Sequence, residues 1–332
     1  MTNEQIVECA KGGGKRNRLP GRRKSEYTEP KKKEGEMKYV TLADLARTIR
    51  KHFYRVPHDV DFVIGVPRSG IICGSIISEF LNCPLIDVDS FCSGAHPTGG
   101  ARLRHHKDPG KKRVLVVDDT IFNGWSMTKT REKLRLFHEY EFIYMAVYLE
   151  GPCSDVDVWL EDLRKFADPF VLYEWNIFHH TIRIMSQSIY DIDGVLCMDP
   201  PDERAEQKYL DYIENAVPLF TPTVEIGEIV SYRLASNEAV TRQWLDTHGI
   251  RFKALTLFPA QHYDERKASG IRPAEFKANI YAARRWARLF VESDDQQARE
   301  ICRMTRKPVY CVGTNMLYQC NDKPTFYAVE TN

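Results

Sequence analysis

Short runs of apolar residues punctuate the chain and alternate with longer segments whose apolar residues recur at helical spacing. Apolar runs without polar alternation are typical of strands that are buried on both faces of a parallel sheet. The clearest run is Val114 to Val117, which consists of four consecutive aliphatic residues. On this pattern we expect strands at residues 61–66, 84–91, 114–117 and 142–149, and a further strand that begins near residue 188.

Segments with apolar residues three or four positions apart predict helices between these strands. In residues 41–53 the apolar side chains of one face are Leu42, Leu45, Ile49 and Phe53. Thr41 is a suitable N-cap for this helix. Similar spacing predicts helices from the turn at 67–70 to residue 81, and at 127–137, 156–166 and 205–216. Strands that alternate with helices predict an α/β fold whose parallel sheets carry helices on each face.

The composition fits a globular chain with two domains of ordinary size. The 332 residues are 43% hydrophobic, and 47 Lys and Arg nearly balance 46 Asp and Glu. This gives ample core and no overall charge that indicates a polyanionic partner. No run has the length of a membrane span or the pattern of a signal peptide, and the nine cysteines include no Cys-x-x-Cys pair. We therefore expect a cytoplasmic protein with reduced thiols and no membrane partner.

The first 37 residues differ from the rest, because lysine, arginine and glycine are abundant there and apolar residues are few. Such a composition predicts a disordered basic tail. A tail of this kind can contact nucleic acid, although a solvated tail or a mistaken start site is the simpler interpretation.

Residues 114–127 combine a strand, two acids, a turn and the start of a helix. Asp118 and Asp119 follow the aliphatic run, and the Asn-Gly-Trp-Ser segment at 123–126 precedes residues with helical spacing. Backbone N–H groups of such a turn, together with the helix dipole, can bind a phosphate. The two carboxylates can accept hydrogen bonds from vicinal ribose hydroxyls or bind Mg²⁺. The pattern indicates a site for a phosphorylated sugar, with an ordinary strand-to-helix turn and a solvated Asp pair as the alternative.

This stretch resembles the phosphoribosyl pyrophosphate (PRPP) motif of the type I phosphoribosyltransferases, in which apolar residues lead into two acids and a phosphate loop. The segment GVPRSG at 65–70 is similar to the pyrophosphate turn of that family, and an arginine beside exposed N–H groups suits a polyphosphate. The resemblance implies a type I phosphoribosyltransferase fold at residues 38–186, with Asp118 and Asp119 also able to bind Mg²⁺. The PRPP-binding residues that it implies are Arg68, Ser69, Gly70, Asp118, Asp119, Thr120, Asn123, Gly124, Trp125 and Ser126.

Two further segments complete the resemblance. Residues 92–113 form a long polar, basic stretch, which inside a domain is usually functional or mobile. The family has a flexible loop here, so Arg102 and Arg104 would neutralise the departing pyrophosphate, unless the segment is a solvated hairpin. Some members build the hood over the base from the position of residues 169–180, which are dense in aromatic side chains. Three of these can stack on a planar acceptor or pack at the junction with the next domain, namely Tyr173, Trp175 and Phe178.

A second pattern begins at residue 188, where Asp191 and Asp193 follow apolar residues and precede Gly194. Two carboxylates two residues apart can act together around one Mg²⁺, and a glycine permits a sharp turn after the strand. The Asp-x-Asp-Gly-Val-Leu sequence resembles motif I of the haloacid dehalogenase-like (HAD) phosphohydrolases. The resemblance implies that Asp191 is the nucleophile that forms an aspartyl-phosphate and that Asp193 is a general acid/base.

The later HAD motifs follow in the expected order. By the resemblance, Ser231 would bind the transferred phosphoryl group, and Lys277 would neutralise the nucleophile and the phosphate. Ser293 stands where many relatives have a second acid, which leaves open whether Asp294 or Asp295 completes the Mg²⁺ shell. The short segment between the first two motifs predicts a HAD-like Rossmannoid fold with a minimal cap at residues 187–325. The metal ligands that the resemblance implies here are Asp191, Asp193, Glu292, Asp294 and Asp295.

Together the two resemblances imply a bifunctional enzyme that uses small-molecule substrates. The first half would transfer phosphoribose from Mg-PRPP to a base-like acceptor with release of pyrophosphate. The second half would hydrolyse a phosphomonoester and could convert the new nucleotide into a nucleoside-like product. Two alternatives remain open, namely a PRPP- or nucleotide-sensing module that regulates a phosphatase, and a phosphatase that acts on nucleic-acid ends.

Two expectations concern the acceptor and the assembly. Phe122 stands where purine-salvage relatives carry an acid, which disfavours a 6-oxopurine acceptor. An acceptor that is already acidic, or one that is not a nucleobase, is expected instead. A homodimer is an expectation at the level of the family alone.

Overall fold

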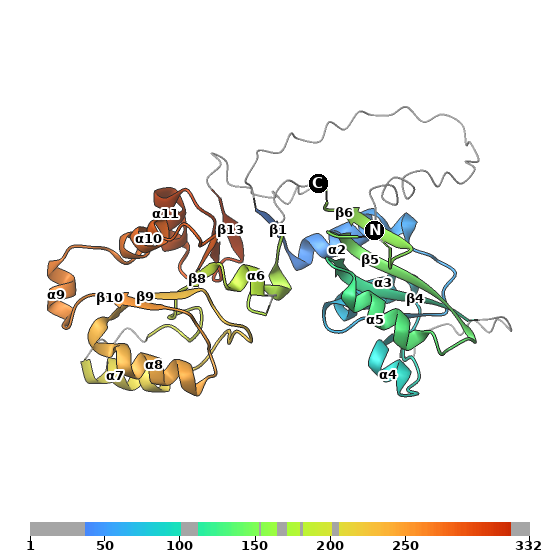
Figure 1. Cartoon of the computed structure of the whole chain (residues 1–332), viewed down its shortest axis with the longest axis horizontal. Coiled ribbons are helices and arrows are strands. Elements are labelled where there is room, and N and C mark those ends of the chain that lie inside the picture. The colour runs from blue at the N-terminus through green and yellow to red at the C-terminus, as the bar shows by residue number, and fades with distance from the viewer. Residues whose placement is uncertain are drawn as a thin grey trace, which may run out of the picture. The chain divides into compact units, whose positions relative to one another are not determined.

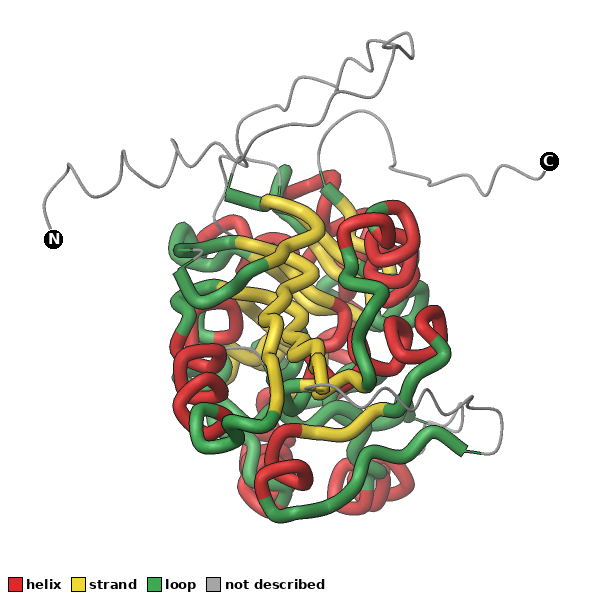
Figure 2. The backbone as a smooth tube through the Cα atoms, turned by 90° about the vertical axis from the view of Figure 1, so that its right-hand side faces the viewer, coloured by secondary structure: helices red, strands yellow, loops and turns green. Residues whose placement is uncertain are grey.

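The structure is a computed structural model that describes residues 37–100, 112–152, 154–164, 171–179, 182–200 and 206–319. Within these residues the strands form two larger sheets and one two-stranded pair. We call the larger ones the N-terminal sheet and the C-terminal sheet. Figure 1 labels many of their elements, and Figure 2 shows strands in yellow and helices in red.

The N-terminal sheet has five parallel strands in the order β3-β2-β4-β5-β6. From β2 the chain first moves to one neighbour, β3, and then crosses to the other neighbour, β4. Ligands of open parallel sheets bind at the carboxyl ends of the strands at such a switch point. The strands are β2 (Phe62–Gly65), β3 (Leu85–Asp87), β4 (Lys112–Ile121), β5 (Tyr140–Leu149) and β6 (Val158–Asp162).

Both faces of this sheet are covered, because successive residues of a strand point to opposite sides. Leu115 and Val117 pack with side chains of α2 and α3, whereas Val114 and Val116 pack with those of α4 and α5. Burial of each of these side chains contributes about 1.5–3 kcal/mol. The four helices are α2 (Leu42–Lys51), α3 (Ser69–Leu81), α4 (Val88–Cys92) and α5 (Trp125–Leu134).

The C-terminal sheet has six strands in the order β10-β9-β8-β11-β12-β13, and all pairs are parallel except β12 with β13. Of the strands in this sheet, β8 comes first in the sequence, and it lies at the centre between β9 and β11. This order again creates a switch point. The strands are β8 (Ser188–Tyr190), β9 (Glu228–Leu234), β10 (Leu255–Phe258), β11 (Leu289–Glu292), β12 (Val309–Cys311) and β13 (Met316–Tyr318).

The same alternation covers both faces of the C-terminal sheet. Tyr190 packs on the side of α8, and Ile189 packs on the side of α10 and α11. Figure 1 shows α10 and α11 on one side of β8, β9 and β10, with α7 and α8 on the other. The helices are α7 (Glu206–Asn215), α8 (Glu238–Thr247), α9 (Tyr263–Ala268), α10 (Pro273–Ala283) and α11 (Asp295–Thr305).

The remaining described elements are short. The two-stranded pair is parallel and joins β1 (Lys38–Val40) to β7 (Val171–Tyr173). The others are α6 (Ile182–Met185) and the 3₁₀ turns η1 (Phe53–Arg55), η2 (Glu174–Asn176) and η3 (Ala235–Asn237). No helix within the described ranges is both long and apolar enough to cross a membrane.

Two sequence expectations about local structure are wrong. The strand expected at 84–91 ends at Asp87, because the Asp87 carboxylate accepts the N–H groups of Asp89 and Ser90 and so starts α4. The helix expected at 156–166 is the strand β6, which pairs with β5. The strand expected to begin near residue 188 and to end at the two carboxylates is β8, Ser188–Tyr190. The expected α/β class with parallel sheets and the Thr41 N-cap of α2 are confirmed.

Candidate functional site

The acidic pair of the first motif lies near the carboxyl end of β4. The strand continues to Ile121, past the expected end at residue 117. Asp118 and Asp119 are both buried. The Asp118 Oδ1 atom accepts the N–H of Asp119 at 2.9 Å, and Asp119 Oδ2 accepts the indole N–H of Trp175 at 2.7 Å. The pair is therefore held in place from two sides.

The electrostatics of this pair disfavour two negative charges at once. Burial raises the pKa of Asp118 well above its ordinary range, and the neighbouring Asp119 charge adds to this. Burial also raises the pKa of Asp119, although hydrogen bonds such as that from Trp175 oppose the effect. A cation or a hydroxyl donor brought to the pair would favour the ionised carboxylates.

The phosphate turn expected at 123–126 is the start of α5. Gly124 has a φ of 76°, a left-handed conformation that favours glycine, and Asn123 Oδ1 accepts the N–H of Trp125 at 3.1 Å. The turn is held by β5, since the carbonyl of Ile121 accepts the N–H groups of Glu150 and Gly151, both at 2.9 Å. The backbone that would bind a phosphate is thus fixed at both ends.

The second expected turn, Arg68 to Gly70, leads into α3. Gly70 lies so close to β4 that a Cβ atom there would be 2.5 Å from the carbonyl oxygen of Val117. Only glycine permits this approach, which brings the turn beside the acidic pair. Arg68 and Ser69 line the same cavity as Asp118 and Asp119.

One cavity of about 520 Å³ unites these segments. Gly70 and Gly124 shape its backbone. The predicted PRPP-binding residues that line it are Arg68, Ser69, Asp118, Asp119, Thr120, Asn123, Trp125 and Ser126. Arg102 and Arg104, which were predicted to close over the site, lie outside the described residues.

The three aromatic residues predicted to contact a base have different positions. Tyr173 lines the cavity and its hydroxyl donates to Glu150 Oε1 at 2.5 Å. Trp175 donates to Asp119, as described above, and its ring lies 5.0 Å from that of Tyr173. Phe178 is buried against Phe220, with stacked rings 4.5 Å apart. Phe178 packs as the alternative interpretation expects, and the stacking role stays a prediction for Tyr173, Trp175 and Phe178.

Three polar cavity residues were missed by the sequence reasoning, namely Glu150, Asn176 and His179. Glu150 directly follows the expected strand 142–149, and this position at a strand end was the available signal. Asn176 and His179 lie in the aromatic segment, where nothing in the pattern distinguishes them. Burial and the nearby Arg68 lower the pKa of His179.

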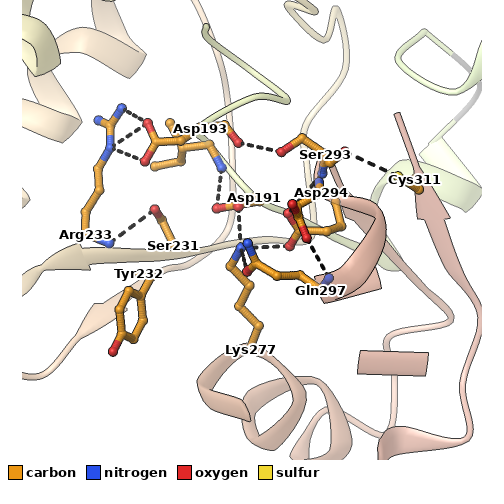
Figure 3. Close-up of polar contacts among 12 residues, drawn as sticks. Asp191, Asp193, Ser231, Tyr232, Arg233, Lys277, Ser293, Asp294, Gln297 and Cys311 are labelled. Atoms are coloured by element: carbon orange, nitrogen blue, oxygen red, sulfur yellow. Dashed lines mark hydrogen bonds and ion pairs between the residues drawn. The ribbon is translucent and has the colours of Figure 1, made fainter. Parts of the chain in front are cut away.

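In the second candidate site, Asp191 follows β8 and is buried (Figure 3). The Lys277 ammonium group, on α10, donates to Asp191 Oδ2 at 2.5 Å and to Glu292 Oε2 at 2.7 Å. Gln297, on α11, accepts a third hydrogen bond from it at 3.0 Å. Burial raises the pKa of Asp191 to about 7 against the opposing charge of Lys277. Three of the charged residues that the HAD resemblance singled out, Asp191, Lys277 and Glu292, are therefore in contact.

Asp193 has its own cation. The Arg233 guanidinium, which is fully buried, donates to both carboxylate oxygens of Asp193, at 2.5 Å and 3.2 Å, and the Tyr212 hydroxyl donates at 2.8 Å. Burial acts to raise the pKa of Asp193, but Arg233 and these hydrogen bonds outweigh it and lower the pKa. Ser231 lies two residues before Arg233 on β9 and is buried, and its Oγ accepts the N–H of Arg233 at 3.4 Å. Tyr212 and Gln297 were missed, since a lone tyrosine or glutamine carries no motif.

Asp294 and Asp295, the two candidates for the last Mg²⁺ ligand, differ in their contacts. Asp295 is engaged away from the cluster, since it accepts hydrogen bonds from Arg299 at 2.9 Å and from Tyr318. Asp294 caps α11 by accepting the N–H of Gln297 at 2.7 Å, and Figure 3 shows it beside Asp191. Asp294 is therefore the better candidate to contribute a ligand.

The metal expectation can be compared with the donors present. Within the described ranges, no group of three or more His, Cys, Asp or Glu side chains is arranged to hold a metal ion. Carboxylates are nevertheless suitable ligands for Mg²⁺, which commonly binds one or two of them and takes its other ligands from substrate phosphates and water. Both clusters fit Mg²⁺ in that manner, with substrate oxygens as the remaining ligands.

The solved structures that are similar to this chain match only part of it. No protein-family model matches it, and no curated protein matches it. A purine phosphoribosyltransferase from Pyrococcus horikoshii is similar over 42% of this chain and 93% of its own, with 22% identity and a TM-score of 0.31. An orotate phosphoribosyltransferase from Aeropyrum pernix covers 37% and 70%, with 23% identity and a TM-score of 0.28.

A xanthine-guanine-hypoxanthine phosphoribosyltransferase from Helicobacter pylori covers 43% of this chain and 95% of its own, with 15% identity and a TM-score of 0.32. At these values the similarity decides neither the activity nor the substrate. The case for a function therefore rests on the geometry of the two clusters.

Proposed function

We propose that the cavity of the N-terminal sheet binds Mg-PRPP and that this half transfers the phosphoribosyl group to a base-like acceptor. The observation that carries the proposal is one cavity lined by the acidic pair, by Arg68 and Ser69, and by the turn that begins α5. These are the groups that a ribose, a pyrophosphate and a 5′-phosphate respectively require.

Each part of the cavity has a role in this proposal. Asp118 and Asp119 accept hydrogen bonds from the ribose hydroxyls and stabilise positive charge that develops at C1 of the ribose. The N–H groups at the start of α5 bind the 5′-phosphate, and Arg68 neutralises the pyrophosphate. The acceptor nitrogen forms a bond to C1 while the C1–O bond breaks, its electron pair leaves with pyrophosphate, and the proton of the acceptor passes to water. Asp118 and Asp119 would hold Mg²⁺ together with oxygens of PRPP, and the ion would supply further neutralisation of the leaving group.

We further propose that the C-terminal sheet carries a phosphomonoester hydrolase of the HAD type. The proposal rests on the contact of 2.5 Å between Lys277 and Asp191 at the carboxyl end of β8. The ammonium group lowers the repulsion between the nucleophile and an incoming phosphate. In this proposal Ser231 binds the phosphoryl group. Asp193 can serve as an acid only if a substrate phosphate competes for Arg233, because that guanidinium stabilises its ionised form.

The two activities can be linked in sequence. A 5′-phosphate that enters with PRPP could be removed at Asp191, which would release a nucleoside-like product. An alternative is that PRPP binding regulates the phosphatase without any transfer. The two differ in whether an acceptor triggers the release of pyrophosphate.

The test measures release of pyrophosphate and of phosphate from PRPP with Mg²⁺ and a panel of acceptors. Wild type is compared with Asp119→Asn and Asp191→Asn. Transfer followed by hydrolysis predicts that Asp119→Asn abolishes pyrophosphate release and that Asp191→Asn accumulates a 5′-phosphorylated product. PRPP binding without pyrophosphate release, alongside hydrolysis of simple phosphomonoesters, would instead identify the first half as a sensor.

A further inference from the structure

Two side chains that can carry positive charge line the cavity of the N-terminal sheet. Among the described lining residues these are Arg68, at the turn into α3, and His179, in the segment that follows β7. The proposed function uses Arg68 for the pyrophosphate and assigns nothing to His179. A pyrophosphate bound to Mg²⁺ still carries net negative charge when it leaves, so a second positive group beside it would stabilise its departure. The inference therefore rests on the proposed phosphoribosyl transfer.

Arg68 and His179 are close enough for their charges to interact. Burial lowers the pKa of the His179 imidazole, and the nearby Arg68 guanidinium lowers it further. Arg68 is exposed, and among the described residues nothing forms an ion pair or a hydrogen bond with its guanidinium. Its charge is therefore available to an anion, and an anion that binds there lies near the His179 ring.

The His179 imidazole is oriented by a residue that precedes β9. Its Nδ1 atom forms a hydrogen bond with the hydroxyl oxygen of Thr223 at 3.3 Å. Among the described residues, no group forms a hydrogen bond with Nε2. Since the hydrogen bond at one ring nitrogen fixes the role of the other, Nε2 is the atom that can donate to a ligand.

The charges around the ring determine its protonation. The other titratable groups of the described cavity lining are Asp118, Asp119, Glu150 and Tyr173. Ionised carboxylates would favour the protonated ring, whereas Arg68 and burial oppose it and prevail. On the far side of the ring, Arg251 donates to the carbonyl of Thr223 at 3.2 Å and adds another positive charge. The ring is therefore mostly neutral in the free protein at pH 7.5. A pyrophosphate beside Arg68 would offset this charge and favour protonation of His179.

We propose that His179 is a second pyrophosphate-binding residue, which donates a hydrogen bond from Nε2 to the leaving group and takes up a proton from solvent as the anion binds. Arg68 holds the pyrophosphate with a permanent charge, whereas His179 becomes charged only when the anion is present. The pair thus stabilises the leaving group without a second fixed cation in the free cavity.

The test is calorimetric titration of the full chain with pyrophosphate and Mg²⁺ at pH 6.0, 7.5 and 8.0. At pH 7.5 it is repeated in two buffers that differ in ionisation enthalpy, because the difference in heat gives the number of protons taken up on binding. The variants are His179→Gln, which keeps a polar side chain but cannot take up a proton, and the control His138→Gln. His138 is an exposed histidine between α5 and β5. Protonation of pyrophosphate itself is the same for every variant, so the differences report on the protein.

Wild type and His138→Gln should take up at least about 0.3 proton more per pyrophosphate than His179→Gln. His179→Gln should bind pyrophosphate about tenfold more weakly than wild type at pH 6.0, because a charge-assisted hydrogen bond is lost, and about threefold more weakly at pH 8.0. An unchanged proton uptake in His179→Gln, whatever its affinity, or an equal change in the control, would overturn this inference and leave the proposed transfer intact. If wild type binds neither PRPP nor pyrophosphate with Mg²⁺, the proposed transfer is overturned together with this inference.

Discussion

The two clusters of carboxylates in this chain differ in the source of their counter-charges. Asp191 and Glu292 share the ammonium group of Lys277, and Asp193 is paired with the buried Arg233. Among the described residues, no lysine or arginine forms an ion pair with Asp118 or Asp119, which accept hydrogen bonds from an amide and an indole. The C-terminal cluster is neutralised by the protein itself, whereas the N-terminal pair is not.

The pKa directions reflect the same difference. Burial raises the pKa of both Asp118 and Asp119, whereas Arg233 overcomes burial and lowers the pKa of Asp193. A site that keeps its carboxylates under electrostatic stress in the free state gains the most from a ligand that brings positive charge or hydroxyl donors. In the proposed function, Mg²⁺ and ribose hydroxyls would relieve this repulsion at the N-terminal pair. At the C-terminal cluster, Lys277 and Arg233 would offset the charge of an incoming phosphate.

The largest expected effect follows from the nucleophile. Asp191→Asn should reduce hydrolysis of phosphomonoesters by about a thousandfold or more, because an amide cannot form the aspartyl-phosphate. Binding of PRPP should be unchanged, since the substitution lies on the other sheet. Phosphate release under saturating substrate checks the first statement. Residual activity near that of wild type would show that Asp191 is not the nucleophile.

The next effect concerns the stability of the C-terminal cluster. Asp193→Asn should lower the free energy of unfolding by about 3–5 kcal/mol, because it leaves the buried charge of Arg233 without its partner. Chemical denaturation followed by circular dichroism measures the change. The control Asp264→Asn, at an exposed residue of α9, should remain within about 0.5 kcal/mol of wild type. Equal stability of both variants would refute an internally neutralised cluster.

A smaller effect is expected from the hydrogen bond between Trp175 and Asp119. Trp175→Phe keeps an aromatic ring but removes the donor at 2.7 Å, which should weaken PRPP binding by about tenfold. Trp286→Phe, at an exposed position of the C-terminal half, is the matched control. Titration calorimetry with Mg-PRPP distinguishes the two. If both variants bind as wild type does, Trp175 does not position the carboxylate.

The smallest effect has the opposite sign. Asp118→Asn should raise the free energy of unfolding of the ligand-free protein by about 1 kcal/mol, because it removes one of two adjacent buried carboxylates. An acid whose folded pKa is raised binds protons more tightly in the folded state, so wild-type stability falls as the pH rises above about 4. The gain from Asp118→Asn should therefore be larger at pH 8 than at pH 4.5 in thermal unfolding. A loss of stability in Asp118→Asn at pH 8 would contradict the proposed repulsion between the two buried carboxylates.

The sequence was sufficient for the features that depend on local pattern. Aliphatic runs identified the central strands, and the spacing of Asp118, Asp119 and the following turn located the cavity. The order of the motifs pointed to Asp191 and Lys277, and these two residues are in contact although 86 positions separate them in the chain. Such features are encoded where strand, acid and turn are adjacent in the sequence.

The features that were missed depend on tertiary contacts. The segment at 156–166 has helical spacing, but pairing with β5 makes part of it a strand. The contacts of Trp175 with Asp119 and of Phe178 with Phe220 join segments that are far apart in the chain, so no local pattern predicts them. The hydrogen bond from Tyr173, on β7, to Glu150 joins two segments that no local pattern contains together.

The most direct measurement is calorimetric titration of the full chain with PRPP, in the presence and absence of Mg²⁺, for wild type, Asp119→Asn and Asp191→Asn. The account predicts one PRPP bound per chain with Mg²⁺. It also predicts an affinity at least about tenfold weaker in Asp119→Asn, because a neutral amide replaces the carboxylate that would contact Mg²⁺ and the ribose hydroxyls. Binding in Asp191→Asn should be unchanged. Equal affinity in Asp119→Asn and wild type, or no binding by wild type, would contradict the claim that the ribose hydroxyls and Mg²⁺ of Mg-PRPP stabilise the ionised N-terminal pair.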